Sequence, residues 1–413
     1  MTATGSISKR SLEDATMERT YLDHAAATPA RPEVVEAMLP YFQERFANPS
    51  AVYDLAAEIK NSIEEQRARV AELIGAPADS IIFTSCGAEA NNLAIKGAAL
   101  ANLKKGRHLI VSAIEHHSVL NSARFLEKFH DFEVTFLPVN RYGQVEPERL
   151  RRTLTPATVL VSIQHASNEI GTVQQIPELA ALCREHGVVF HTDAVATAGS
   201  VPIDVKDMQV DLLTLSGPAL GAPKGIGALY FRPKVRLVPQ IHSGIQESGR
   251  RGGTENVPGI IGLGTAAKLA IGELEERARH LRFLRDRLVA GVMDRIPAVI
   301  YTGHPEKRLP GHASFCFEGI EGEALIFMLN RRGIYANTGS ACASKALKVS
   351  PTLCAIGLSP DVAQGSIVFT FSRDNRDEEM DYVLTELPQA VERLRSFSPV
   401  WHKKMAAASG ESR

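Results

Sequence analysis

The sequence carries almost no net charge. Its 413 residues include 46 Lys and Arg side chains against 47 Asp and Glu, which gives a formal charge of −1 at pH 7. A protein that tracks the phosphate backbone of DNA or RNA needs an extended basic surface, and this balance does not supply one. We therefore expect no nucleic-acid partner, and a charged ligand would have to be bound by a local group of side chains.

Long hydrophobic runs are also missing. No stretch of about 18 consecutive apolar residues occurs, which is the length that a membrane-spanning helix requires. The first 19 residues lack the apolar segment that a secretory signal peptide carries. We therefore expect no membrane partner and a cytoplasmic location.

Cysteine is scarce and scattered. The five thiols form no C-x-x-C pair and are too few for a disulfide framework, so we expect reduced cysteines and no metal site. A free cysteine most often packs as a small hydrophobic residue, so a reactive one must be recognised by its local sequence. The five are Cys86, Cys183, Cys316, Cys342 and Cys354.

Hydrophobic residues, at 44%, are plentiful, and the length is well above the roughly 150 residues of a typical domain. We expect a large α/β domain over residues 20–270 and a smaller α+β domain over residues 271–401. Residues 1–19 are expected to pack near the small domain or to be disordered, and residues 402–413 to form a tail.

Short β-rich segments alternate with helical segments between residues 80 and 232. This alternation predicts an α/β fold with a mainly parallel seven-stranded sheet, covered by helices on both faces. Ligands of such sheets bind beyond the carboxyl ends of the strands, so the residues that follow each strand are the candidates for chemistry. The seven segments are SIIFTS, HLIVSAI, EVTFLPV, TVLVSI, VVFHTDA, LLTLS and GALYF.

Small and polar residues gather after these strands and in later loops, in a pattern that core packing does not require. The segments are YLDHAAATP, TSCGAEANNLAI, SAIEHHSVL, HASNEIG, FHTDAVA, SGPALGAPKGIGALYF, SGRRGGTENV and TGSACAS. This ordered series resembles the cysteine desulfurases of the class V aminotransferase family, which use pyridoxal phosphate (PLP). The resemblance spans roughly Tyr21 to Trp401 and implies the fold-type I architecture of PLP-dependent transferases.

The resemblance assigns a pocket for the cofactor. Gly87 follows a strand and opens a helix, where free backbone N–H groups favour a phosphate. Asp193 stands where the family pairs a carboxylate with the pyridine nitrogen, which keeps the ring an electron sink. His116 stands where an imidazole stacks on the ring, and Asn168 where an amide meets the ring hydroxyl. Each of these residues, taken alone, also suits an ordinary structural role.

Two further positions belong to the implied pocket. Ser216 ends the strand LLTLS, beside the family's lysine loop. Thr254 matches a threonine that, in the family, reaches the phosphate of the partner subunit. The resemblance therefore implies a homodimer, although a threonine kept for turn geometry would look the same. Arg250 and Arg251 precede Thr254 and form a small basic loop, which could hold an anion or be a solvated surface.

Cys342, in the segment TGSACAS, carries the most specific signal. Small residues surround the thiol, as suits a loop that moves a nucleophile between a donor and an acceptor. In the family the cysteine of this loop takes sulfur from the substrate, becomes a persulfide and passes the terminal sulfur on. A thiolate is needed there because it is the strong nucleophile.

The sequence departs from the family at the lysine that forms the Schiff base with PLP. The corresponding position is Ala219, which has no amine. We therefore expect no covalently bound cofactor and the loss of the ordinary PLP cycle. Lys224 is close by, but the family has a lysine at that place as well as the catalytic one, so we do not expect it to substitute.

Other positions of the same pocket have changed too. A histidine before the lysine is Pro218, a phosphate-binding threonine is Ala88, and a glutamine beyond the pyridine aspartate is Ala196. The arginine that clamps the substrate carboxylate aligns with Val368, and a histidine after the NPS segment is Tyr53. The concentration of changes in one pocket indicates natural divergence rather than a single engineered substitution.

Three functions stay open on this sequence. The first is a cytoplasmic sulfur-handling enzyme that uses Cys342 without the PLP cycle, on a small thiol substrate or sulfur donor and with a sulfur-acceptor protein. The second is a PLP-dependent cysteine desulfurase that converts L-cysteine to L-alanine and a persulfide, seen as a variant that lacks its lysine. The third is a catalytically silent dimeric scaffold for sulfur or iron–sulfur partner proteins, with Cys342 as a ligand.

Overall fold

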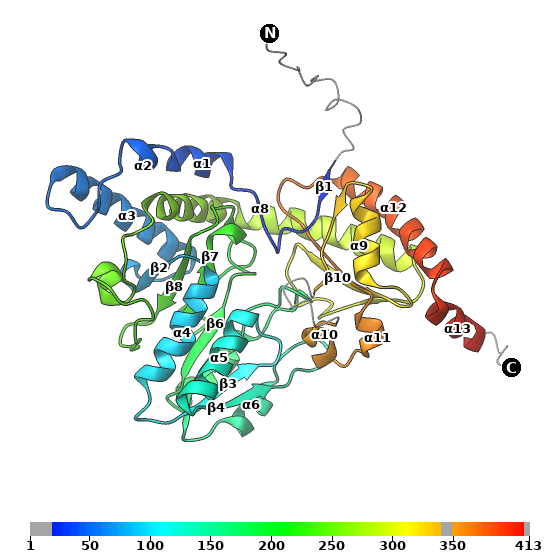
Figure 1. Ribbon diagram of the computed structural model, residues 1–413, viewed down its shortest axis with the longest axis horizontal. Coiled ribbons are helices and arrows are strands. Elements are labelled where there is room, and N and C mark those ends of the chain that lie inside the picture. Colours follow the sequence, from blue (N-terminus) through cyan, green and yellow to red (C-terminus); the bar gives the residue numbers. More distant parts are fainter. Residues whose placement is uncertain (1–18, 340–348, 409–413) are drawn as a thin grey trace, which may run out of the picture.

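The computed structural model describes residues 19–339 and 349–408. It shows a large α/β body and a smaller α+β body joined by one long helix, α8, Val257–Arg295 (Figure 1). Cys342 lies outside the described residues.

The large body is built on a seven-stranded sheet, as the alternating segments predict. The strand order is β2-β8-β7-β6-β5-β3-β4. β8 runs antiparallel to both of its neighbours, whereas β4, β3, β5, β6 and β7 pair in parallel. The strands are β2 Ile81–Thr84, β3 His108–Ser112, β4 Glu133–Leu137, β5 Thr158–Ser162, β6 Val189–Asp193, β7 Leu212–Ser216 and β8 Gly227–Phe231.

Alternate side chains of each strand enter different hydrophobic clusters, because successive residues of a strand face opposite sides of the sheet. In β2, Ile81 and Phe83 join a cluster with α3, α7 and the first half of α8, whereas Ile82 joins a cluster with α4 and α5. The helices are α1 Pro32–Met38, α2 Pro40–Gln43, α3 Asp54–Leu73, α4 Gly87–Ala101, α5 His117–His130, α6 Pro147–Thr153 and α7 Ile176–Glu185. The short 3₁₀ turns are η2 Ala78–Ser80, η3 Gly217–Leu220 and η4 Gln246–Gly249.

The small body has its own core. Leu281, Leu284 and Leu288 of α8 pack with a three-stranded antiparallel sheet of order β12-β10-β9 and with α9 and α12. A two-stranded parallel pair, β1-β11, joins the start of the described chain to this body. The elements are β1 Thr20–Tyr21, β9 Val299–Tyr301, β10 His312–Phe317, α9 Gly322–Asn330, β11 Ile334–Tyr335, α10 Pro351–Ala355, α11 Pro360–Ala363, β12 Ser366–Thr370, α12 Asp377–Ser396 and α13 Pro399–Ala408.

The end of the described chain is helical rather than an irregular tail. Helix α13 runs to Ala408 and packs beside α12, with the Arg395 guanidinium 4.0 Å from the centre of the Trp401 ring. Lys404 forms an ion pair with Glu318. These contacts give residues 402–408 a folded environment that the sequence pattern does not indicate. The domain boundary at residue 270 stays a prediction, since α8 runs through it without a break.

Helix α8 is also long and apolar enough to cross a membrane, judged by length and composition. Its most apolar window, however, is 56% buried inside the protein. Ile260, Leu263 and Ala267 pack in the core of the large body. The hydrophobic character of α8 is therefore accounted for by its two internal interfaces.

Candidate active site

The candidate site is centred on Asp193, the last residue of β6. Its carboxylate is 7% exposed and accepts hydrogen bonds from Asn91 Nδ2 at 2.7 Å and from the Val195 backbone N–H at 2.9 Å. Burial raises the pKa of this carboxyl, and the Asn91 hydrogen bond opposes that shift. Asp193 is thus a fixed, desolvated carboxylate at the carboxyl edge of the sheet.

His116 lies at the N-terminus of α5, after β3, and is exposed. Its Nδ1 accepts from the Ser118 backbone N–H at 3.2 Å, and Ser118 Oγ lies 2.7 Å from the same nitrogen. Ser118 Oγ accepts in turn from Asn91, which also bonds to Asp193. A chain of hydrogen bonds therefore couples the exposed imidazole to the buried carboxylate.

The loop between β2 and α4 is held close to the end of β7. A Cβ added to Gly87 would lie 3.0 Å from Val195 Cγ2 and 3.2 Å from Ser216 Cβ, which is tighter than ordinary packing. Only glycine lets the start of α4 approach these two strand ends without displacement. The structure thus brings Gly87, Asp193 and Ser216 to one region, as the sequence predicts.

The basic loop before α8 is tied to the same region. Arg251 Nε donates to Glu89 Oε1 at 2.9 Å, and Glu89 also accepts from the Ser85 backbone N–H at 2.8 Å. Arg250 stacks over the Phe231 ring at 4.4 Å. Arg251 therefore holds the loop between β2 and α4 in place through an ion pair. This structural role is neither the anion binding nor the solvated surface that the sequence suggests. Thr254, in the same loop, is exposed.

Four of the positions at which the sequence departs from the family follow the same strands as the residues described above. Ala88 is exposed in the first turn of α4, and Ala196 is partly exposed after β6. Pro218 and Ala219 form part of η3, directly after β7, and both are partly exposed. None of these four side chains carries a polar group, so this edge of the site offers less hydrogen bonding than the strand ends around Asp193.

Val368 lies apart from the other altered positions, in the small body. It is 5% exposed in β12 and exchanges backbone hydrogen bonds with Asn337 at 2.7 and 3.2 Å. Asn337 also donates from Nδ2 to the Asp23 carboxylate. A buried valine fits this apolar position in the antiparallel sheet and supplies no cation to the candidate site.

Asn168 is exposed in the turn after β5, and its carbonyl oxygen accepts from His312 Nε2 at 2.9 Å. The next residue, Glu169, contributes a contact that sequence reasoning missed. Its buried carboxylate accepts from Ser350 Oγ at 2.5 Å and from Thr352 Oγ1 at 2.8 Å. Glu169 Oε2 would lie 3.0 Å from a Cβ at Gly339, so this side chain lies beside Gly339 as well as beside Ser350.

Glu115 is the second missed residue. It is 4% exposed, its Oε1 accepts from the Gln164 backbone N–H at 2.7 Å, and its Oε2 has no partner among the described residues. Burial and, to a smaller extent, the charge of Asp193 raise its pKa well above the usual value. Glu115 precedes His116 in the sequence, but only the fold brings its carboxylate toward Asp193.

The described thiols differ sharply in environment. Burial raises the pKa of Cys316 to about 12 and raises that of Cys183 further, so neither is a ready nucleophile. Cys86 is partly exposed at the N-terminus of α4, and Cys354 is exposed. The part of the chain covered by the structure has no group of three His, Cys, Asp or Glu side chains arranged to hold a metal ion.

This fold and strand-end site define a member of the class V aminotransferase family, and the chain belongs to it: the family model matches residues 20–383. The chain is 49% identical to the cysteine desulfurase IscS of Methanosarcina thermophila, over 93% of this chain and 95% of that protein. It is 46% identical to the cysteine desulfurase IscS of Dictyoglomus turgidum, over 92% and 96%.

Solved structures agree with this assignment. A NifS-like protein superposes with a TM-score of 0.85 at 34% identity and covers 91% of this chain and 100% of its own. A structure of SspA in complex with cysteine gives a TM-score of 0.76 at 35% identity, over 86% of this chain and 99% of its own. The fold-type I architecture is thereby confirmed.

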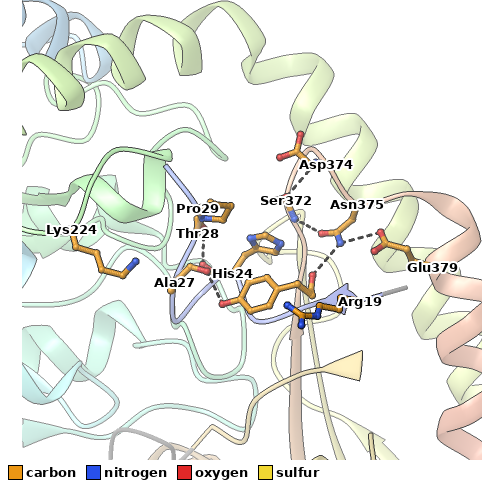
Figure 2. Close-up of a pocket in the computed structure, with 11 residues that line it drawn as sticks. Arg19, His24, Ala27, Thr28, Pro29, Lys224, Ser372, Asp374, Asn375 and Glu379 are labelled. Carbon is orange, nitrogen blue, oxygen red and sulfur yellow. Dashed lines mark hydrogen bonds between the residues drawn. The ribbon is translucent and has the colours of Figure 1, made fainter. Parts of the chain in front are cut away.

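The residues present fit PLP only in part. Two groups that the resemblance assigns to the ring lie in one region: Asp193 is a buried carboxylate, and the exposed His116 ring lies within electrostatic range of it. The side chain of Ala219, directly after β7, has no amine, and Lys224 lines a cavity together with residues of the N-terminal segment and the small body (Figure 2). Asp193 and His116 thus offer a carboxylate and an imidazole to a PLP ring, and the loss of the covalent anchor at Ala219 stays a prediction.

Proposed function

We propose that this protein is a sulfur-handling enzyme of the cysteine desulfurase type that acts as a homodimer in the cytoplasm, with Cys342 as the sulfur-carrying nucleophile. The observation that carries the proposal is the retention of the TGSACAS segment in a chain that is 45–49% identical to several proteins named cysteine desulfurase. The thiols of Cys183 and Cys316 are buried with raised pKa values, which leaves few competitors for this role.

The sulfur-transfer step needs no imine. The Cys342 thiolate attacks the terminal sulfur of a small persulfide donor, the donor's sulfur–sulfur bond breaks, and the donor leaves as a thiolate. The electron count is unchanged, since one persulfide is lost and one is formed. The terminal sulfur is then passed to an acceptor thiol, on a partner protein or a small molecule, by the same exchange.

We further propose that the lysine-dependent PLP cycle has been lost. Ala219, Ala196 and Val368 support it, because amine, amide and guanidinium groups are replaced by side chains that neither form an imine nor clamp a carboxylate. Under this proposal the altered pocket is reached by a sulfur donor rather than by L-cysteine as a PLP substrate.

A second candidate is a PLP-dependent cysteine desulfurase, favoured by the high identity to cysteine desulfurases and by the retained Asp193, His116 and Asn168. In that case Asp193 would hold the pyridine nitrogen and His116 would stack on the ring. Bound PLP supplies an electron sink for chemistry at the substrate's carbon atoms. The buried Asp193 carboxylate is oriented by Asn91 and Val195 for such a contact.

One experiment separates the two candidates. The full-length protein is incubated with L-cysteine, with and without PLP, and separately with a small persulfide donor, while alanine release and the mass of the Cys342 peptide are followed. We expect a gain of one sulfur at Cys342 from the persulfide and no alanine. PLP-dependent alanine release would establish the second candidate, and a Cys342 that stays unmodified under every condition would refute both.

Cys354→Ser is the matched control, because Cys354 is the exposed thiol in the described part of the chain. We expect this variant to accept sulfur as the unmodified protein does and Cys342→Ser to accept none. An Ala219→Lys variant with PLP should gain an adduct that borohydride reduction makes permanent, whereas the natural sequence should not. An equal adduct in both proteins would show that another amine anchors the cofactor.

A further inference from the structure

A continuous run of hydrogen bonds leads from the buried end of β6 to the exposed ring of His116. Asn91, in α4, donates from Nδ2 to Asp193 Oδ2 at 2.7 Å and to Ser118 Oγ at 2.8 Å. Ser118 Oγ lies 2.7 Å from His116 Nδ1. Asn91 is 1% exposed, so its two contacts are shielded from water. The order of donors along this run decides which nitrogen of the imidazole holds the proton.

The direction of the run is set at its buried end. Asp193 accepts from the Val195 backbone N–H as well as from Asn91, as a carboxylate does. Asn91 Oδ1 is buried and has no partner among the described residues. An amide turned the other way would place that oxygen against the Asp193 carboxylate and leave two buried N–H groups without an acceptor. Asn91 therefore presents its NH2 group to both Asp193 and Ser118.

Ser118 carries the same direction to the imidazole. Its hydroxyl accepts from Asn91, so its one hydrogen is free to be donated to His116 Nδ1. The Ser118 backbone N–H also donates to this nitrogen, at 3.2 Å. A backbone N–H cannot accept, so Nδ1 must offer a lone pair rather than a proton. The neutral imidazole has a single N–H group, which therefore lies at Nε2.

The other ring nitrogen, Nε2, lies across the ring from these donors. His116 is exposed, and no hydrogen bond joins its Nε2 to any described residue. The ring of the neighbouring His117 is 6.3 Å away, measured between ring centres, and tilted. The Nε2–H group is therefore available to an acceptor atom of a ligand, whereas the lone pair at Nδ1 is already engaged.

We propose that Asn91 and Ser118 are positioning residues that hold His116 as the Nε2–H tautomer, so that its ring is a hydrogen-bond donor toward a ligand and not a base. Nε2 has no lone pair with which to take a proton from a ligand, and Nδ1 would first have to lose both Ser118 contacts. The inference does not rest on the proposed chemistry of Cys342, because every hydrogen bond in it belongs to the protein alone.

Magic-angle-spinning ¹⁵N NMR tests the proposal on the full-length protein, labelled at histidine only and measured at about pH 8.5, above the ordinary pKa of histidine. His116→Gln identifies the two ring signals of His116 among those of the 13 histidines by their loss. We expect the downfield signal of an unprotonated nitrogen from Nδ1 and the signal of a protonated nitrogen from Nε2. Ser118→Ala removes one donor and should move the Nδ1 signal further downfield, and Ser118→Thr, which keeps the hydroxyl, should restore it.

Asn91→Leu tests the buried part of the run. It removes the donor to Ser118 Oγ, so the hydroxyl is less polarised and its hydrogen bond to His116 weakens. We expect the Nδ1 signal to move in the same direction as in Ser118→Ala, by a smaller amount. Asn92→Leu is the matched control, because this neighbouring amide bonds to the Ala88 carbonyl within α4. It should leave both His116 signals unchanged.

The buried His108 ring, held by its own hydrogen bonds, reports in the same spectra whether each variant keeps the fold. If Asn91→Leu fails to fold, Ser118→Ala, at a partly exposed position, decides. A proton on Nδ1 of His116 in the unmodified protein, an Nδ1 signal that is the same in Ser118→Ala, or equal shifts in Asn91→Leu and Asn92→Leu would each overturn the proposal.

Discussion

At the scale of single residues, the site is dominated by buried carboxyl groups whose partners differ. Asp193 has two hydrogen-bond donors, whereas Glu115 has one, and one of its oxygens is unpartnered among the described residues. Desolvation penalises the charged form of both groups. Near the site, the buried carboxylate of Glu115 is therefore the group that most clearly lowers the free energy of unfolding.

We predict that Glu115→Gln stabilises the protein at neutral pH. The folded-state pKa of Glu115 is raised, so its favourable contribution is present below about pH 4.5, the ordinary value for a glutamic acid, and is lost as the pH rises through the folded pKa. A neutral amide avoids that loss. We expect a gain of about 1–3 kcal/mol in unfolding free energy at pH 7.5 and a much smaller difference near pH 4.

Urea unfolding of both proteins at the two pH values measures this effect. Glu318→Gln, which alters a carboxylate far from the site in the small body, serves as the comparison. A gain for Glu115→Gln that is equal at both pH values would contradict the linkage argument.

We predict that Glu169→Ala is destabilising, because it leaves the hydroxyl groups of Ser350 and Thr352 without their acceptor. Hydrogen bonds to charged groups contribute about 1.5–3 kcal/mol each, so a loss of at least about 2 kcal/mol is expected. A double-mutant cycle with Thr352→Val should show coupling between the two positions. Strictly additive effects would mean that the 2.8 Å contact contributes nothing of its own.

Sequence reasoning predicted which residues after the strands lie together and missed the residues that hold them in place. Asp193, Ser216 and Gly87 could be located because the carboxyl edge of a parallel sheet gathers them. Asn91, Glu115 and Glu169 could not, since their roles depend on contacts with residues 102, 49 and 181 positions away in the chain. The sequence shows the polar segments EANN and NEIG, but it does not show the distant residues with which their side chains form hydrogen bonds.

At the scale of elements, two ion pairs hold the loop between β8 and α8: Arg251–Glu89 and the more deeply buried Arg67–Glu247. Glu247 has a positive φ of 47° and accepts from Arg67 Nη1 at 2.8 Å and from the Phe83 backbone N–H at 2.9 Å. Its side chain is 4% exposed, and that of Arg67 is 10% exposed. Turn η4 is thereby tied to both α3 and β2.

We predict that Glu247→Ala destabilises the protein by about 3–5 kcal/mol, because it leaves the Arg67 guanidinium buried with a weaker partner. The unfolding free energy measured with guanidinium chloride tests this. Glu65→Ala, which removes an exposed partner of Arg69 on the same helix α3, should cost less than about 1 kcal/mol. Similar losses in the two variants would show that burial does not distinguish the two pairs.

At the scale of the whole molecule, the sheet and its helices could be predicted, and the way the chain ends join the small body could not. Short apolar segments that alternate with helices predict the seven strands, because most of these strands are buried on both faces; the edge strand β4 is the exception. The parallel pairing of β1 with β11 joins residues more than 300 positions apart and has only two residues per strand. So short a pair leaves no periodicity for a sequence pattern to show.

The segment from α1 to the loop before α3 exposes several large apolar side chains. Leu39, Phe42 and Phe46 are 61%, 59% and 70% exposed, and Val52 follows in the same segment at 104%. Exposed large apolar side chains close together in the chain favour an interaction surface, and we expect this segment to lie in the proposed dimer interface. We predict that Phe42→Asp shifts the protein toward monomer, as measured by sedimentation velocity, whereas Phe397→Asp, at an exposed residue after α12, does not. A variant that sediments as the unmodified protein does would place the interface elsewhere.

The length of helix α8 limits how the two bodies can move relative to each other. Its 39 residues span about 60 Å, and its two halves are buried in different cores. A hinge within it would break several backbone hydrogen bonds at once, so the two bodies are coupled as if by a stiff rod. A movement of one body relative to the other therefore requires α8 to bend, and we expect access to the strand-end site to depend on loops and side chains instead.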